Sequence, residues 1–475
     1  MKIRTSRRTV IKGGLALVGG SLFFPSLASS EKVLQSKNST DHNNKVVYMW
    51  SGALKPTSIR INVCMERSGS IRLGIEDSAG KEIIMPAIEM IDEEDDPNNN
   101  YKIATFDVIG LTPDTQYKYW VLVDGVRDSK VGRFKTPGYG AYSFKVAFGN
   151  CCQTGSESEL FLDILEKDPL MFIHTGDFHY ENIQTNDPAS FRNAYKKVMA
   201  STTQSALYQN TPVAYMWDDH DYGGNNTDES SPSAEAAQAM YRHCVPHHEL
   251  ENEHGAIYHS FVIGRVKFVM TDNRSYRDPV TKPDTSEKTM LGAEQKAWLL
   301  QELLTGKQEN VLTVWVNSVP WISSWDLDTW AGFSNERREI SNFIEANEIK
   351  NIAMIGGDAH ILAIDDGRHN RFGDKQTALF PVIHAGPLDG YPTYRGGPYS
   401  QLAHQRSGHY GLMEVRDTGS ILEIIWLGYH FDSDAENKSR AGNNVLNYSF
   451  VVNEPINIVI DHDHQIHLPL IQSGQ

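Results

Sequence analysis

Residues 170–180, which read LMFIHTGDFHY, decide how the rest of the chain is interpreted. A run of apolar, strand-forming residues ends directly in Asp177 and His179, two side chains that can bind a metal. Three further runs have the same form: FKVAFGNCCQ at 144–153, PVAYMWDDHD at 212–221 and NIAMIGGDAH at 351–360. A site for two metal ions needs several rigid strands whose carboxyl ends converge on one small volume. The four runs therefore predict a sheet whose strand ends meet at a dinuclear metal centre.

Strand and helix patterns alternate after residue 137, which predicts an α/β fold with a mixed sheet covered by helices over residues 138–475. The predicted helices are 157–167, 188–200, 233–243, 293–304 and 334–347. A second sheet is predicted from aromatic-containing strand patterns at 258–263, 266–271, 410–415 and 420–427. The tail at 451–470 is strand-like, and we expect its Asp461–His464 stretch to be solvated rather than a metal site.

Residues 45–137 have a different pattern, in which short strands alternate with turns. The predicted strands are 46–50, 58–65, 70–75, 81–87, 101–108, 116–123 and 132–135. This number of strands over about ninety residues is typical of a β-sandwich. The stretch LTPDTQY at 111–117 resembles the tyrosine corner of fibronectin type III domains, and FKTP at 134–137 resembles the end of such a domain.

The first 28 residues predict a targeting signal. Paired Arg7 and Arg8 precede an apolar stretch at 13–24 and a small-residue end at Ala28, the pattern that the twin-arginine export machinery recognises. An ordinary signal peptide with two arginines remains an alternative. The apolar stretch is too short to span a membrane, so no transmembrane anchor is expected. Residues 29–44 are polar and predict a linker, and the mature protein is expected in the periplasm or outside the cell.

Composition limits the function classes. The 475-residue chain is 40% hydrophobic, enough for two or three domains with a large core. Its formal net charge is −16, and the predicted signal holds basic residues but no acid, so the mature part is more acidic still. This charge argues against nucleic-acid partners and anionic membrane surfaces. Four cysteines are too few for a disulfide scaffold, although a Cys151–Cys244 bridge stays open.

The side chains at the strand ends supply the candidate site. A two-metal site holds the attacking and leaving oxygens of a phosphoryl transfer and makes hydroxide available at moderate pH. Each residue taken alone could be a solvated acid or a satisfied histidine, but their joint position at four strand ends favours a site. The predicted metal ligands are Cys152, Asp177, Tyr180, Asn317, Asp358, His360 and a carboxylate of residues 217–221, and His220 is predicted to serve in acid–base chemistry.

These motifs resemble the calcineurin-like metallophosphoesterases and, among them, the PhoD-type alkaline phosphatases and phosphodiesterases. Cys152-Gln153 is similar to that family's Cys-Gln. The family's Gly-Asp-x-x-Tyr-Glu matches residues 176–181, and its Gly-Asp-x-His matches residues 357–360. Its Trp-Asp-Asp-His-Glu corresponds to residues 217–221, where Asp221 replaces Glu, so Asp221 is assigned no role. Residues 272–277 resemble its Asp-Thr-Arg-x-Tyr-Arg, with Asn273 in place of Thr.

The resemblance implies a metallophosphatase-type two-sheet α/β/β/α sandwich, preceded by the all-β fibronectin-like or immunoglobulin-like sandwich. It implies Fe³⁺ and Ca²⁺ as cofactors, although zinc or manganese could replace iron. The implied roles are Cys152, Tyr180 and His360 on iron, Asp177 as the bridge, Asp219 on the second metal and Asp358 on calcium. His220 would protonate the leaving group or contact the phosphoryl oxygens. Arg274 would hold phosphate oxygens, with a structural Arg–Asp pair as the alternative.

The implied function is hydrolysis of phosphate diesters, monoesters or both, with hydroxide at the metals as the attacking group. The substrate would be a small phosphate ester or a lipid headgroup. An exported protein that binds metal or phosphate without catalysis, or an adhesion protein, is the alternative from another class. A phosphodiesterase directed at phospholipids is a third hypothesis, and it would require an exposed apolar rim.

Overall fold

The computed structural model describes residues 46–66, 69–90, 102–309, 312–404, 406–432 and 442–452. The predicted signal, the linker and Asp461–His464 lie outside these residues. None of the helices in the described ranges has the length and apolar character needed to span a bilayer.

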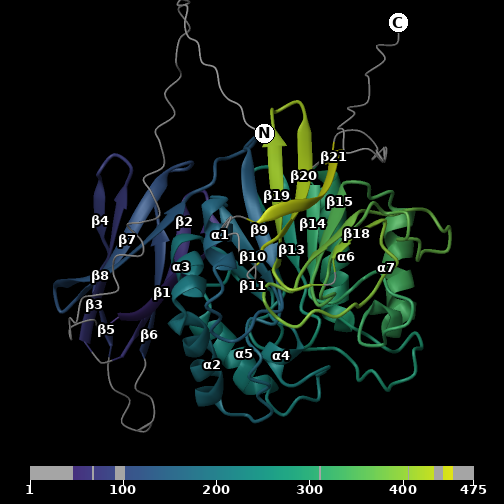
Figure 1. Cartoon of the computed structure of the whole chain (residues 1–475), viewed down its shortest axis with the longest axis horizontal. Coiled ribbons are helices and arrows are strands. Elements are labelled where there is room, and N and C mark those ends of the chain that lie inside the picture. The colour runs from purple at the N-terminus through teal and green to yellow at the C-terminus, as the bar shows by residue number, and fades with distance from the viewer. Residues whose placement is uncertain are drawn as a thin grey trace, which may run out of the picture. The chain divides into compact units, whose positions relative to one another are not determined.

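The first sheet has the strand order β21-β20-β19-β9-β10-β11-β1-β2-β6 (Figure 1). Its centre is three parallel strands, β9 (Phe144–Gly149), β10 (Met171–Thr175) and β11 (Val213–Met216). These are the first three apolar runs of the sequence, and they are almost wholly buried because helices or strands cover both faces. The other strands are β1 (Val46–Lys55), β2 (Ser58–Met65), β6 (Lys102–Ile109), β19 (His409–Asp417), β20 (Leu422–His430) and β21 (Asn443–Val451).

The second sheet has the order β12-β13-β14-β15-β17-β16-β18. It also has a parallel centre, formed by β13 (Val266–Met270), β14 (Leu312–Asn317) and β15 (Ile352–Gly356), the last being the fourth apolar run. The remaining strands are β12 (His259–Ile263), β16 (Leu362–Asp365), β17 (Val382–Ala385) and β18 (Gln401–His404).

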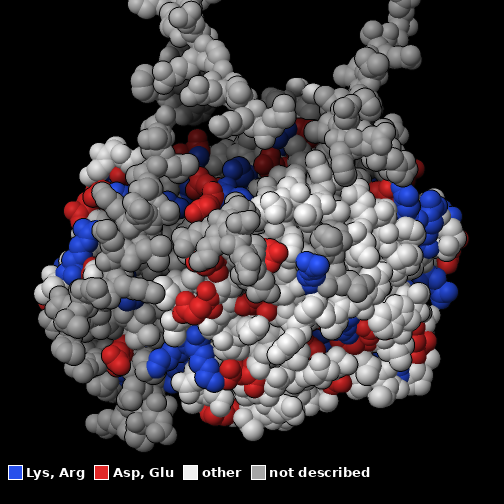
Figure 2. Space-filling model, in the orientation of Figure 1, with Lys and Arg blue, Asp and Glu red and all other residues white. Residues whose placement is uncertain are grey.

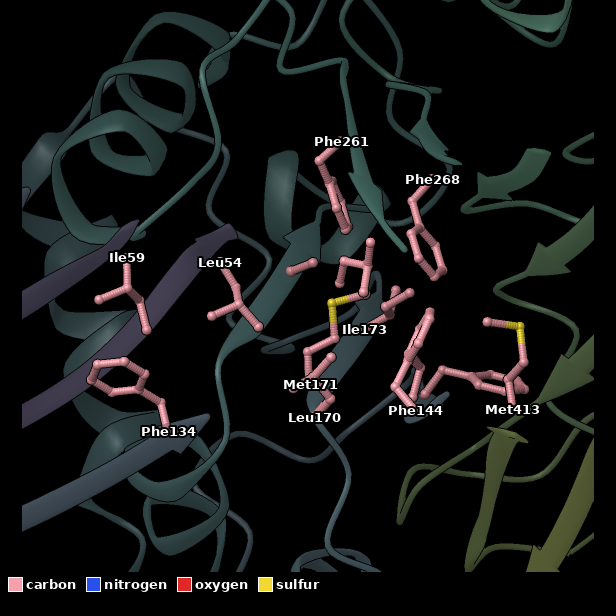
Figure 3. Close-up of a cluster of buried hydrophobic side chains, with 14 of the residues drawn as sticks. Leu54, Ile59, Phe134, Phe144, Leu170, Met171, Ile173, Phe261, Phe268 and Met413 are labelled. Atoms are coloured by element: carbon pink, nitrogen blue, oxygen red, sulfur yellow. The ribbon is translucent and has the colours of Figure 1, made fainter. Parts of the chain in front are cut away.

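The two sheets pack face to face between two layers of helices. Figure 3 shows Met171 and Ile173 of the first sheet facing Phe261 and Phe268 of the second, within one apolar cluster. A second cluster joins the outer face of the first sheet to α1 (Leu160–Glu166), α2 (Pro188–Ala200), α3 (Thr202–Asn210) and α5 (Ala234–Cys244). A third joins the second sheet to α6 (Gly292–Gln308), η3 (Trp330–Phe333) and α7 (Ser334–Ala346). The predicted α/β/β/α sandwich is confirmed.

The N-terminal β region is present, and it is joined to the first sheet. Its own sheet contains β3 (Gly69–Asp77), β4 (Glu82–Ile84), β5 (Ile88–Met90), β7 (Gln116–Val123) and β8 (Val126–Lys135). The backbone N–H of Thr112 donates to the Tyr117 hydroxyl at 2.8 Å, as in a tyrosine corner. The facing strands β1, β2 and β6 belong to the large sheet, because Gly52 of β1 pairs in parallel with Val213 of β11. A domain division at residue 137 stays a prediction, and one sheet runs across it.

Strand β1 also supports the first strand-end loop. Trp50 is buried, its indole nitrogen donates to the Cys244 carbonyl at 3.2 Å, and its ring stacks on Phe178 with centroids 5.8 Å apart. Phe178 directly follows Asp177. Strand β1 therefore packs against the loop that carries Asp177, the main candidate metal ligand.

Histidine 174 of β10 is buried without a polar partner. Neither ring nitrogen has a hydrogen bond, and the ring lies among Phe172, Phe178 and Tyr215. Burial, and then the neighbouring His179, lower the pKa of His174 to about 3. The fold therefore holds this histidine neutral.

Replacing His174 by leucine is expected to make the fold less sensitive to acid. An unfolded histidine takes up its proton near pH 6.5, roughly, whereas folded His174 stays neutral down to a pKa of about 3. Stability present above pH 6.5 is therefore lost as the pH falls from 6.5 toward 3, by about 2 kcal/mol on reaching pH 5. Urea unfolding of chelator-treated protein at pH 7 and pH 5 measures this loss. The loss of stability between pH 7 and pH 5 should be smaller in His174→Leu than in the wild type. It should be unchanged in the control His254→Leu, in which the replaced residue is exposed. Equal losses in the wild type and both variants would contradict the prediction.

Candidate metal centre

The site lies where the carboxyl ends of the parallel strands of both sheets meet. A Cβ atom on Gly357, after β15, would lie 2.4 Å from the Thr175 carbonyl oxygen of β10 and 2.5 Å from that of Ser318, after β14. Gly176 has a φ of +107°, and a Cβ there would meet Asp218 at 2.5 Å. Glycine is the residue that permits these approaches, so the strand-end motifs are packed directly against one another.

Two sets of ligand-type side chains meet at this edge of the sheets. Within each set the candidate ligand atoms lie within 4.8 Å of one another. The first set is Cys151, Asp177, Asp358 and His360, and the second is Asp177, Asp219 and His220. Asp177 belongs to both sets, as a carboxylate bridging two ions must. The structure thus brings together the predicted ligands Asp177, Asp219, Asp358 and His360.

The carboxylates are too close and too buried to share the site without cations. Asp177, Asp218, Asp219 and Asp358 are each at most 3% exposed. Burial, and then Asp219 and the other neighbouring acids, raise the pKa of Asp177 well above its ordinary value. One oxygen each of Asp177 and Asp218 is buried without a hydrogen-bond partner. Because buried, unpaired carboxylate oxygens are costly, bound cations are their natural partners.

The donor set fits a thiolate- and phenolate-bound ion beside a second ion held by oxygen ligands. The Tyr180 hydroxyl donates to Asp177 Oδ2 at 2.8 Å, and it also interacts with the Cys151 thiol. Burial raises the pKa of both Cys151 and Tyr180, so a bound cation would be needed to ionise them at neutral pH. Asp358, which the resemblance places on calcium, lies in the same set as Cys151 and His360.

His220 is the second residue of α4 (Asp219–Tyr222) and is held by a neighbouring amide. Its Nδ1 lies 2.5 Å from Asn182 Oδ1, and Asn182 Nδ2 donates to the Tyr180 carbonyl at 3.0 Å, which fixes the orientation of the amide. The amide oxygen can only accept, so Nδ1 carries the proton and Nε2 is left toward Asp219, 4.0 Å away. Burial lowers the pKa of His220, against the opposing effect of Asp219.

Backbone strain is concentrated at this site. Among the described residues, twelve residues other than glycine have positive φ, a conformation that is unfavourable for side chains with a Cβ. Half of them belong to the site or contact its residues: Cys151, Asp177, Asn182, Asn226, Asp358 and His360. The backbone N–H of Asn226 donates to Asp219 Oδ2 at 2.6 Å. The strained backbone conformations direct the side chains that follow the strands toward one point.

Comparison with known proteins identifies the family. The family model described as PhoD-like phosphatase matches residues 150–390, about half of the chain, and this range contains both ligand sets. The chain belongs to the PhoD-like phosphatase family. Alkaline phosphatase D of Bacillus subtilis (strain 168) is 24% identical over 303 residues, which are 53% of this chain and 52% of that protein. The chain thus spans about half the length of this curated relative.

A solved structure shows the shared fold. A structure of PhoD superposes with a TM-score of 0.72 at 16% identity and covers 87% of this chain and 92% of that chain. A dimetal phosphatase from Danio rerio matches with a TM-score of 0.38 at 10% identity, over 65% of this chain and 98% of that one. The PhoD-like fold therefore extends over the N-terminal β region as well as the site.

The structure corrects the choice of cysteine within the PhoD-like motif. Cys151, not Cys152, lies with Asp177 and His360. Cys152 points to the helical layer, where its sulfur accepts a hydrogen bond from Gln204 Nε2 at 3.1 Å. The left-handed backbone at Cys151, with a φ of 56°, turns that thiol toward the metal side. All four cysteines are free, so the Cys151–Cys244 bridge is not formed.

Replacing each cysteine in turn tests this correction. Cys151→Ala is expected to lose metal from the first ligand set, because it removes a candidate ligand. Cys152→Ala is expected to keep this metal and to lower only stability, since it leaves a small cavity beside Gln204. Metal analysis and the visible spectrum of the two purified variants measure the difference. Metal lost from Cys152→Ala and kept in Cys151→Ala would restore the first assignment.

Asn317, predicted as a metal ligand, has a structural role at the end of β14. It is fully buried at the end of β14, and its amide oxygen accepts from the Trp330 indole nitrogen at 3.1 Å. Its amide nitrogen donates to the Val319 carbonyl. These bonds tie β14 to the loop that follows.

Arg274, predicted to hold the phosphate, is also a structural residue. Its side chain is completely buried. Its Nε donates to Asp218 Oδ1 at 2.7 Å, and its Nη1 contacts Asp328 Oδ1 at 3.3 Å. The structural Arg–Asp pair, the alternative left open by the sequence, is the arrangement found. With no exposed surface, the Arg274 guanidinium positions carboxylates in this arrangement.

The accessible arginine is Arg395, which sequence reasoning missed. It lies in the loop between β17 and β18, and its side chain is 18% exposed. It donates to Asp358, to Asp326 Oδ2 at 2.8 Å and to Asp328 Oδ2 at 3.0 Å. Burial acts to raise the pKa of Asp358, but Arg395 and then His360 outweigh it and hold that pKa below its ordinary value. No apolar strand precedes Arg395, so no strand-end signal marked it.

Proposed function

We propose that this protein is an exported, metal-dependent phosphoesterase that hydrolyses phosphate diesters, monoesters or both. The observation that supports this most is the shared Asp177, which joins two sets of metal-ligand side chains beside His220. A site that merely stores a cation has no need for two ligand sets with a common carboxylate, or for a histidine held by an amide. Membership in the PhoD-like phosphatase family supports the same reaction class.

The residues fit the two cofactors that we propose, Fe³⁺ and Ca²⁺. Cys151, Asp177, Tyr180 and His360 would hold iron, because thiolate and phenolate ligands suit the ferric ion, and Asp177 and Asp219 would hold the harder calcium ion. Ions bound there would neutralise charge on the phosphoryl group and make hydroxide available at moderate pH. Zinc or manganese at either position would serve the same purpose.

The protein's own side chains then bind the phosphate and move a proton. Arg395 presents an accessible guanidinium whose planar N–H groups match phosphate oxygens. His220 lies beside the second ligand set and, when its ring carries a proton on both nitrogens, donates the Nε2 proton to the leaving oxygen, while Asn182 holds the Nδ1–H. Arg274 and Asp328 hold Asp218 in place beneath the site.

Export is proposed from the sequence. The paired Arg7 and Arg8 and the apolar stretch that follows support passage through the twin-arginine machinery as a folded protein, to the periplasm or the cell exterior. Export after folding suits a protein that loads its metals first. On the face shown in Figure 2, acidic and basic side chains are interspersed. Because the net charge of the chain is −16, the bound cations must supply the attraction for a phosphate substrate.

The test is hydrolysis of a chromogenic phosphate diester and the corresponding monoester by metal-loaded mature protein, across pH. Turnover that a chelator abolishes and that iron with calcium restores is the expected result. The ratio of the two rates sets the preference between diester and monoester. Absence of turnover in protein shown to contain its metals would overturn the proposal in favour of a binding protein.

A further inference from the structure

Three large apolar side chains are exposed beside the metal centre. Trp325 and Leu327 are each 59% exposed, and Tyr391 is 82% exposed. Trp325 is the most exposed of the nine tryptophans, all of which lie in described residues; the others are buried or partly buried. We call these three residues the apolar rim.

The apolar rim is connected to the metal ligands through short contacts. Trp325 and Leu327 flank Asp326, which accepts from Arg395 at 2.8 Å, and Arg395 in turn donates to Asp358. On the other side, the Tyr391 carbonyl accepts from His360 Nδ1 at 2.5 Å. Each rim residue is therefore at most two contacts from a candidate ligand.

The loops that carry the rim are fixed. The Gly397 N–H donates to the Ile322 carbonyl at 2.7 Å, which joins the two loops. The Thr329 hydroxyl donates to the Asp326 carbonyl at 2.6 Å, and a Cβ on Gly332 would meet the Leu327 carbonyl at 2.1 Å. The outward direction of the rim side chains is therefore set by a packed backbone.

The exposure of Trp325 is selective, because neighbouring tryptophans in the sequence are buried. Trp321 and Trp330, on either side of the rim segment, are fully buried in the core of the second sheet. Exposed apolar area costs about 25 cal/mol per Å² relative to burial, so neighbouring exposed Trp and Leu side chains indicate a surface that is covered by a ligand. The group that reaches this surface while its phosphate lies at Arg395 is the organic part of the substrate.

We propose that the preferred substrates are phosphodiesters with an apolar alkyl or aryl group, and that Trp325, Leu327 and Tyr391 bind this group. This inference rests on the proposed function and narrows its substrate class. The apolar rim supplies hydrophobic contact, and Arg395 and the bound cations supply the contacts to the anionic phosphate. The proposal assigns the three rim residues to specificity and not to the chemical step.

The test is a series of alkyl 4-nitrophenyl phosphates, from methyl to hexyl, with the metal-loaded enzyme. The leaving group and charge are constant, so only the apolar group changes. We expect kcat/KM to rise at least about tenfold from methyl to hexyl, since partial burial of each added CH₂ contributes. The hexyl-to-methyl ratio should fall toward one in Trp325→Ser/Leu327→Ser/Tyr391→Ser, and by a smaller factor in the single variant Trp325→Ser.

The matched control is Ile421→Ser, which removes an exposed apolar side chain at the turn between β19 and β20. It should keep the wild-type ratio. Comparing the two esters within each protein cancels any change that affects both. Equal hexyl and methyl rates in the wild type, or a wild-type ratio in the triple variant, would overturn the inference while leaving the proposed function standing. Absence of turnover of every ester by the wild type would instead defeat the proposed function.

Discussion

Asp177→Asn is expected to abolish binding of both metals and to lower kcat/KM for a phosphate diester by more than about 10³-fold. Asp177 is the residue shared by the two ligand sets, so its loss weakens both positions at once. The same substitution should stabilise the metal-free protein, because it removes one of several buried carboxylates that raise the pKa of one another. Metal analysis gives the first result, and thermal unfolding with and without chelator gives the second.

Asp163→Asn is the matched control. Asp163 is a buried carboxylate in α1 that accepts from the Tyr410 hydroxyl and pairs with Lys167, away from both ligand sets. Its replacement should lower stability and leave the metal content unchanged. If Asp177→Asn retained both metals, or unfolded at a lower temperature than the wild type in chelator, Asp177 would not be the bridge of a carboxylate-rich metal centre.

His220→Ala is expected to lower kcat by roughly 10²–10⁴-fold while both metals remain bound, because the lost group is a proton donor to the leaving oxygen. The loss should be larger for an alkyl leaving group than for 4-nitrophenolate, which departs without a proton. Asn182→Ala should lower kcat with the same dependence on the leaving group but by a smaller factor. The imidazole remains, but its Nδ1 loses the 2.5 Å contact that orients it. Rates for both leaving groups and metal analysis of each variant provide the measurement.

The competing interpretation of His220 is that of a metal ligand, because it lies in the second ligand set with Asp177 and Asp219. Loss of one metal from His220→Ala, with an equal loss of rate for both leaving groups, would favour that role. Asn182→Asp separates the cases further: a carboxylate at this position keeps the hydrogen bond to Nδ1 and should retain more activity than alanine.

The fold was predictable where local signals were strong. Helix α2 was predicted at its observed bounds, since Asp187 caps its first turn and Pro188 occupies the first helical position. Asp177, Asp219 and Asp358 were predicted because each directly follows a buried apolar strand. Helix α3 was missed, since only Ser201 separates it from α2 and no turn signal marks the break.

The errors in predicting the site arose where contacts between distant segments decide the position of a side chain. Cys152 was chosen because it directly precedes Gln153, as in the family's Cys-Gln, but the turn of the backbone after β9 brings the Cys151 thiol to the ligands. Arg274 resembled a free phosphate-binding cation because its partners, Asp218 and Asp328, come from distant segments. Arg395 belongs to a loop rich in Gly, Pro and Tyr whose position depends on the ends of β15 and β17.

The parallel pairing of β1 with β11 sets the order in which this protein can be completed during synthesis. The first described strand leaves the ribosome early, yet the partner of Gly52 is Val213, so that edge of β1 stays uncovered while the whole N-terminal β region and two strands of the central sheet are made. Such distant pairing slows folding and leaves an unpaired strand available to neighbouring chains. The free edge of β1 should therefore stop pairing with neighbouring chains only once β11 has emerged.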